Sequence, residues 1–114
     1  MNAALGFLGL ARKAGALVTG EENARHAVRS AQAKLLVVSA DASANARKRA
    51  EELVKGTSVP LAALPLTKEA VSSATGRPGC SMAVFTDTGL AAAFLRALAA
   101  EYGEAYSPLA ELLG

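Results

Sequence analysis

Residues 35–38 read Leu-Leu-Val-Val, an unbroken apolar run between Lys34 and Ser39. A short run of this kind, with two β-branched side chains, is typical of a strand that is buried on both faces of its sheet. Such a strand requires a layer of helices on each side. The run therefore predicts an α/β fold with this strand near the middle of the sheet.

Helical patterns flank this strand on both sides. Upstream, Thr19 and Glu22 have the spacing of a capping box, and a stripe of alanines continues to about Ser30. Downstream, Ser43 is a good helix cap, and the helix that it begins is expected to end near Lys55, before a glycine. The strand is thus predicted to lie between two amphipathic helices.

The rest of the chain continues this alternation. Further helices are predicted at residues 2–14, 67–75 and 87–100, and further strands at residues 16–18, 59–64 and 82–86. Strands that alternate with helices usually form parallel sheets, since a parallel connection has to cross back over the sheet. We predict a three-layer α/β/α sandwich with a small, mostly parallel sheet.

The last residues depart from the pattern. Gly103 and Pro108 interrupt the final helix, and Leu109, Leu112 and Leu113 follow. We expect a single domain at residues 1–101 and a C-terminal tail at residues 102–114, which either docks through its leucines or frays.

Composition limits the class of protein. The chain has 114 residues, enough for one core, and 52% of them are hydrophobic while 19% are charged, which argues against disorder. No stretch approaches the roughly 18 apolar residues that span a bilayer, and Cys80 is the only cysteine, so neither an internal disulfide nor a multi-cysteine metal site is expected. The sequence predicts a cytoplasmic protein, a monomer, without cofactor or metal and with no membrane partner.

Charge is unevenly distributed along the chain. Residues 1–77 hold 11 Lys and Arg against 6 Asp and Glu, whereas residues 78–114 hold 1 against 4. The net charge is therefore +5 in the first part and −3 in the second, so a basic binding surface is expected in the first part. Arg47, Lys48 and Arg49 could belong to it, but a solvated helix face is the favoured interpretation because acidic residues follow one turn later.

Residues for catalysis are scarce. Cys80 and His26 could form a thiol–imidazole pair, but nothing in the sequence brings the helix of His26 to the loop of Cys80. The glycine-rich loop at residues 76–79 has no P-loop lysine, and a strand rather than a helix follows it. We predict that the protein is not an enzyme.

A binding site is expected at one edge of the sheet. Ligands bind parallel α/β sheets at the carboxyl ends of the strands, which here are followed by loops at residues 19–22, 39–42 and 65–66. Helix N-terminal amides at such an edge can hold phosphate oxygens, and short polar side chains can reach base edges. This chemistry favours a nucleic-acid ligand.

Several spaced blocks resemble a known family. They are residues 10–15 (Leu-Ala-Arg-Lys-Ala-Gly), 18–22 (Val-Thr-Gly-Glu-Glu), 27–30, 33–35, 39–43 and 84–87. The sequence resembles the YlxQ-like bacterial members of the ribosomal L-seven-Ae and L-thirty-e superfamily over about residues 5–90. The resemblance implies an α/β/α sandwich, no catalysis and, for many relatives, recognition of kink-turn RNA.

The contact loop of that family differs here. The strong kink-turn binders carry Gly-x-Asn-Glu followed three residues later by Lys. After Gly20 and Glu21, this chain has Glu22 in place of the Asn, Asn23 in place of the Glu and His26 in place of the Lys. A carboxylate only accepts hydrogen bonds, so Glu22 cannot reproduce the contacts of an amide. His26 either contacts phosphate or is a surface histidine beside Glu22.

The family's second contact loop corresponds to residues 71–76, where Ala74 and Gly76 match its pattern. Gly76 would let the backbone approach a sugar-phosphate chain, and Arg77 would donate to a phosphate or a guanine edge. Among single residues, Arg77 is the strongest candidate for RNA contact.

We therefore expect a non-enzymatic protein that binds structured RNA, either a kink-turn or ribosomal RNA, and not DNA. The alternative is a protein-interaction or scaffold domain that kept the fold and lost the RNA site. The predicted RNA-binding residues are Gly20, Glu21, Glu22, Asn23, His26, Arg29, Ala40, Asp41, Thr75, Gly76 and Arg77.

Overall fold

The structure is a computed structural model that describes residues 3–77 and 81–113. The helices are α1 (Ala3–Lys13), α2 (Glu21–Arg29), α3 (Ala44–Val54), α4 (Lys68–Thr75), α5 (Thr88–Tyr102) and α6 (Ser107–Leu113), with a 3-10 turn η1 (Glu104–Tyr106) before α6. The strands are β1 (Leu17–Thr19), β2 (Leu35–Val38), β3 (Leu61–Ala63) and β4 (Met82–Phe85).

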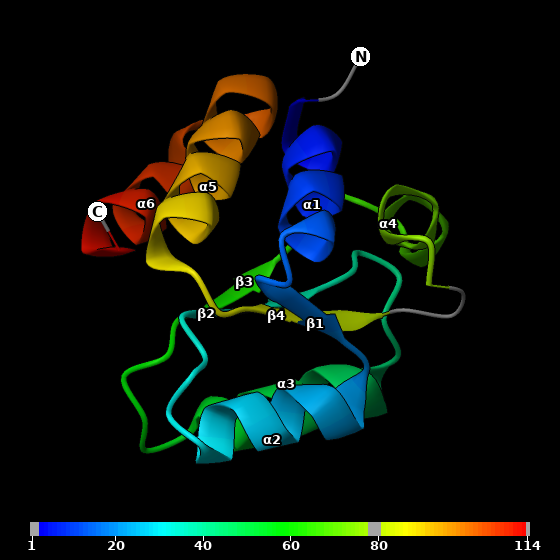
Figure 1. The fold of residues 1–114 in the computed structure, drawn as a ribbon, viewed down its shortest axis with the longest axis vertical. Helices are drawn as coiled ribbons and strands as arrows, with labels where there is room; N and C mark the ends of the chain where they lie inside the picture. Colours follow the sequence, from blue (N-terminus) through cyan, green and yellow to red (C-terminus); the bar gives the residue numbers. More distant parts are fainter. Residues whose placement is uncertain (1–2, 78–80, 114) are drawn as a thin grey trace.

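The elements form three layers. The sheet lies in the middle, with α2 and α3 on one face and α1, α4, α5 and α6 on the other (Figure 1). The strand order is β1-β4-β2-β3, and every residue of β2 and β4 is buried. The predicted three-layer α/β/α sandwich is confirmed, and the run at residues 35–38 is a central strand as expected.

The sheet is mixed, so the prediction of a mostly parallel sheet was wrong. Only β2 and β3 pair in parallel, whereas β4 runs antiparallel to both β1 and β2. The reason is the short α4, which spans about 12 Å along its axis and is seen nearly end-on in Figure 1. It does not carry the chain back along the strands, so β4 begins at the edge where β3 ends.

Most helix starts follow the sequence signals. Ser43 caps α3 and Thr67 caps α4, each accepting a hydrogen bond from the backbone N–H three residues later. Asp87 caps α5 by accepting a hydrogen bond from the N–H of Leu90 at 2.9 Å. These side chains satisfy backbone donors that a helix leaves unpaired in its first turn.

The predicted capping box of α2 is absent. Gly20, not Thr19, is the N-cap residue, and no side chain caps this helix. Thr19 cannot fill the role because it is the last residue of β1, where it faces Ala83 of β4. The chain then has to turn sharply, and Gly20 allows this with a φ of 91°, a value that other residues rarely adopt.

The tail docks on the domain. Ala110 in α6 is buried, and Leu109 and Leu113 pack against the same core as α5. The hydroxyl of Tyr106 donates to the carbonyl of Ala63 in β3 at 2.9 Å. No helix within residues 3–77 and 81–113 is long and apolar enough to cross a membrane.

Candidate nucleic-acid interface

One edge of the sheet gathers the loops that were predicted to form the site. Thr19 pairs with Ala83, and Val38 pairs with both Met82 and Ala63, so β1, β2 and β3 all end where β4 begins. This edge, which we call the loop edge, lies at the right of Figure 1 beside α4. Because β4 is antiparallel to β2, the loop between α4 and β4 also lies at the loop edge. In a parallel sheet this loop would lie at the opposite edge.

Acidic residues at the start of α2 are held in ion pairs. Glu21 accepts from Arg25 at 2.9 Å and from Arg49 of α3 at 2.6 Å, and its side chain is 29% exposed. Glu22 is 86% exposed and also pairs with Arg25. Two arginines thus offset two carboxylates. Arg49 lies half-exposed on α3, as expected of a solvated helix face, and its ion pair also links α3 to α2.

Asn23 stabilises the turn between β1 and α2. Its side-chain Nδ2 donates to the carbonyl of Thr19 at 2.9 Å. The bond holds the turn around Gly20, whose own N–H donates to Met82 at 2.9 Å. Asn23 is exposed, so its other polar atoms face solvent at the loop edge.

His26 and Arg29 lie farther along α2. Both are exposed, and α2 extends away from the loop edge (Figure 1). At 1.5 Å per residue, His26 is about 7 Å and Arg29 about 12 Å along the axis from Glu21. The structure therefore places His26 past the middle of α2 and Arg29 at the end of the helix opposite the loop edge.

Asp41 connects two loops of this edge. Its Oδ1 accepts a hydrogen bond from the N–H of Lys68 at 2.7 Å, at the start of α4. That bond, together with the positive charge of Lys68, lowers the pKa of Asp41 below its ordinary value. Next to it, the carbonyl of Ala40 accepts from Arg47 at 2.8 Å. Asp41 and Ala40 thus support the loop, and Lys68 and Arg47 add positive charge beside them.

Three predicted RNA-binding residues lie at the C-terminal end of α4 and directly after it, and they differ in the groups that they expose. Thr75 is 8% exposed and its hydroxyl donates to the carbonyl of Val71, so its side chain faces the core. Gly76 ends α4 in the left-handed conformation with a φ of 73°. Arg77 follows and is exposed at the loop edge. Of the three, only Arg77 has an exposed charged side chain, and it follows the turn that Gly76 makes.

Three cations outside the predicted set of RNA-binding residues lie at or beside this edge, and the sequence had favoured a solvated helix face for one of them, Arg47. Lys68 and Arg47 flank the loop of Asp41, and Arg12, at the end of α1, lines a pocket together with Arg77. Arg12 and Arg77 are 65 positions apart in the sequence, and no local pattern links them. Their proximity depends on how α1 packs against α4.

The edge is suited to binding anions. It exposes guanidinium and ammonium groups from several elements, which donate hydrogen bonds to phosphate oxygens. Within residues 3–77 and 81–113, no cluster of His, Cys, Asp or Glu could hold a metal ion. Cys80, the other half of the thiol–imidazole pair considered above, lies outside the described residues.

Comparison with known families gives a match over residues 2–94, to the "Ribosomal protein L7Ae/L30e/S12e/Gadd45 family". The chain belongs to this family. The matched region extends from α1 into α5 and includes every loop of the loop edge. A comparison with curated proteins gives no match.

Two solved structures share the family's fold with this chain. A protein with unknown function from Bacillus halodurans superposes with a TM-score of 0.78 at 24% identity, covering 86% of this chain and 98% of that one. The 15.5kD RNA binding protein of Giardia lamblia superposes with a TM-score of 0.65 at 17% identity, covering 84% of this chain and 82% of that one. At these identities the likeness shows a common fold.

Proposed function

We propose that this chain binds structured RNA at the loop edge and catalyses no reaction. The observation that carries the proposal is the convergence of three loops at one edge, where cations are exposed and the acidic residues are paired. Membership of the L7Ae family supports it, and so does the common fold with an RNA binding protein. The finer parts of the proposal are a kink-turn or ribosomal RNA as the target, a YlxQ-like bacterial origin, a cytoplasmic location and a monomeric state.

The ion pairs of Glu21 bear directly on RNA affinity. A free carboxylate at the start of α2 would repel phosphate, but Glu21 is shared between Arg25 and Arg49. The remaining cations of the edge can then attract RNA with little opposition. We propose that Arg77, Lys68 and Arg47 supply this attraction and that residues 1–101 contain the whole site.

Binding should be measured with the purified protein against two RNAs of equal length, one containing a kink-turn and one a plain duplex. We expect binding at low salt that weakens as salt rises, because phosphate contacts release counterions. Tighter binding to the kink-turn would support shape recognition. No binding to either RNA at low salt, from a folded protein, would overturn the proposal.

A scaffold domain that lost its RNA site is the second candidate. The observation that favours it is Glu22, which is 86% exposed at the loop edge and can only accept hydrogen bonds. Under this hypothesis the protein would purify without nucleic acid. The ratio of absorbance at 260 and 280 nm after purification in low salt distinguishes the two, since an RNA-binding protein is expected to retain cellular RNA.

A further inference from the structure

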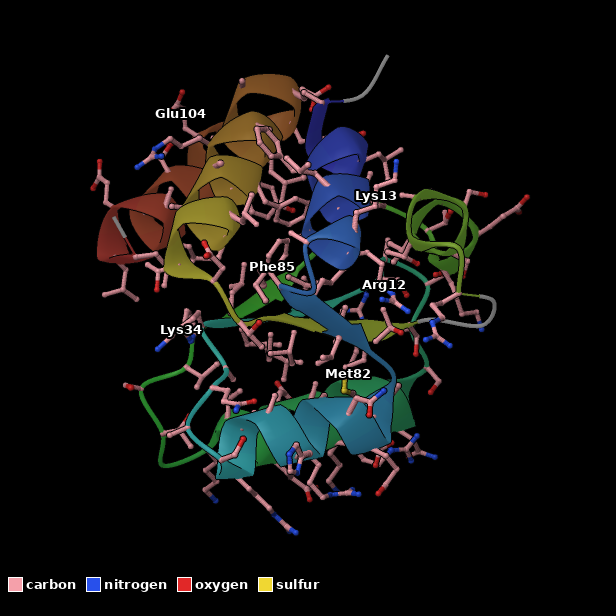
Figure 2. All side chains as sticks on the ribbon, in the orientation of Figure 1. Arg12, Lys13, Lys34, Met82, Phe85 and Glu104 are labelled. Atoms are coloured by element: carbon pink, nitrogen blue, oxygen red, sulfur yellow. The ribbon has the colours of Figure 1, made fainter. Side chains whose placement is uncertain are left out.

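A small pocket opens along the free edge of β1, where α1 ends and α2 begins. It has a volume of about 170 Å³ and is lined by Arg12, Leu17, Val18, Thr19, Asn23 and Arg77. Figure 2 shows Arg12 below the end of α1, on the side that faces α4. Binding pockets for drug-sized ligands usually measure about 300 Å³ or more, so this one suits a single small group.

Close packing of α1 against α4 brings the two arginines to this pocket. A side-chain carbon at Gly9 would lie 3.0 Å from the carbonyl oxygen of Ala74, so the two helices meet where only glycine fits easily. Arg12 follows Gly9 by three residues, and Arg77 follows Ala74 by three residues. The contact therefore brings the helix ends that carry the two arginines close to one another.

Neither guanidinium has a carboxylate partner among the residues that the structure describes. The salt bridges found there join Arg25 and Arg49 to acidic residues at the start of α2, and none involves Arg12 or Arg77. Two like charges that share a small pocket repel one another, and an anion between them would relieve this repulsion. The pocket is electrostatically suited to an anion.

The free edge of β1 adds a main-chain donor. Gly20 donates to Met82, and Thr86 donates to Ala16, so residues 16, 18 and 20 direct their polar groups toward β4. Thr19 alternates with them and directs its N–H and carbonyl away from the sheet. The carbonyl of Thr19 accepts a hydrogen bond from the side chain of Asn23, which is consistent with this outward direction. The N–H of Thr19 lies on the same outward side, where Thr19 lines the pocket.

We propose that this pocket binds one phosphate group of the RNA backbone, held jointly by Arg12, Arg77 and the N–H of Thr19. The inference rests on the proposed RNA binding and extends the loop edge to Arg12 of α1, which lies outside the contact loops of the family. Two forked guanidinium groups can each donate two hydrogen bonds to phosphate oxygens. Gly9 acts as a positioning residue, because it allows the close approach of α1 and α4, which carry the two arginines to the pocket.

The test is a double-mutant cycle with Arg12→Gln and Arg77→Gln, measured as RNA affinity at several salt concentrations. If both arginines hold one phosphate, each single variant loses about tenfold in affinity, and the double variant loses clearly less than the product of the two. The slope of log affinity against log salt should fall by about 0.9 in the double variant, the value for one phosphate. If the affinity losses of the two single variants multiply in the double variant, and its salt slope changes by about twice the value for one phosphate, the joint site is overturned.

Lys13→Gln is the matched control for Arg12→Gln. Lys13 is the next residue in the last turn of α1, is exposed and does not line the pocket. The substitution removes the same charge from the same helix end. Arg96→Gln on α5 serves in the same way for Arg77→Gln. We expect both controls to keep most of the affinity, and losses equal to those at Arg12 and Arg77 would assign the effect to net charge alone and overturn the site.

A second measurement does not depend on RNA. Titration of ¹⁵N-labelled protein with inorganic phosphate, at constant ionic strength, should shift the amide signal of Thr19 in the wild type and much less in Arg12→Gln. If RNA binds but the cycle is additive and phosphate leaves Thr19 unshifted, the pocket is overturned and the proposed function stands. If no RNA binds but phosphate shifts Thr19, the proposed function fails and the pocket takes free phosphate instead of an RNA backbone.

Discussion

The two helix layers bury different kinds of side chain against the same sheet. The core between the sheet and α1, α4, α5 and α6 contains large side chains, among them Leu8, Phe85 and Phe94, whereas, among the described residues, the core between the sheet and α2 and α3 is smaller, has no buried aromatic side chain and is half alanine. Figure 2 shows this division along β4, where Phe85 faces α1 and α5 and Met82 faces α2 and α3. Burial of a large side chain contributes more free energy than burial of alanine, because more apolar area leaves water.

The difference suggests separate roles for the layers. The first layer is the larger source of stability, and it holds the sheet and Arg12 in place. The second layer is thin, and the ion pair of Glu21 with Arg49 ties its two helices together. Both layers end at the loop edge, so substitutions in either layer can affect it. In the first layer the effect would come through apolar packing, and in the second through the ion pair.

Substitution of Phe94 should have the largest effect on stability. Phe94 is fully buried, and its ring lies 5.0 Å from that of Phe85 between centroids. Phe94→Ala is expected to lower the free energy of unfolding by about 3–5 kcal/mol, measured by urea denaturation. The matched change in the other layer, Ala27→Gly, should cost only about 1 kcal/mol. Equal losses would contradict the contrast between the layers.

Removal of residues 104–114 should have the second largest effect on stability. This change uncovers the face of α5 that α6 protects, and we expect a loss of roughly 2–4 kcal/mol in the free energy of unfolding. RNA affinity should stay unchanged, because α6 packs on α5, away from the loop edge (Figure 1). Tyr106→Phe, which removes only the hydrogen bond to Ala63, should cost about 1 kcal/mol. A loss of RNA affinity in a folded truncated protein would assign part of the site to the tail.

Glu21→Gln should separate stability from binding. The substitution breaks the ion pairs with Arg25 and Arg49 and is expected to lower stability by no more than about 1 kcal/mol, because both pairs are partly exposed. RNA affinity should rise about threefold at low salt, since two cations are released. Glu52→Gln on α3 makes the same change in net charge away from these pairs. If Glu21→Gln weakens RNA binding, its carboxylate contributes to the site directly.

Asp41→Asn should have the smallest effect. The pKa of Asp41 is lowered in the folded protein from its ordinary value of 3.8 by the N–H and the charge of Lys68. The ionised carboxylate therefore stabilises the fold when the pH is above that ordinary pKa. This stabilisation is lost as pH falls through the lowered pKa. The wild type should therefore exceed Asp41→Asn in stability at pH 7, with the difference fading between about pH 5 and pH 2. A constant difference across that range would show that the charge of Asp41 is not the cause, and Glu69→Gln is the control for net charge.

Local signals were sufficient for most of the elements. The apolar run of β2 and the cap Ser43 depend on neighbours within a few residues, and the structure has them where the sequence predicted. The capping box at Thr19 failed because pairing with β4 holds this residue in a strand. A partner 64 positions away in the chain thus overruled a local pattern.

The site was predictable only in part for the same reason. Gly20, Asn23, Asp41, Gly76 and Arg77 lie at the loop edge as expected, because each lies within four residues of the end of a strand or helix that the sequence marks. The side chain of Thr75 faces the core instead, and Arg29 lies at the far end of α2. Which side of a helix faces the core depends on the packing of the whole element.

The sequence by itself determined the alternation of helices and strands, the central strand and the family, since these follow from side chains within short windows and from blocks in order. Only the tertiary structure decided the direction of β4, the pairing of Glu21 with Arg49 and the meeting of Arg12 with Arg77. Each of these joins residues that are far apart in the chain. The direction of β4 depends on the length of α4, and the meeting of the two arginines depends on the close fit at Gly9, which becomes effective only when the helices pack.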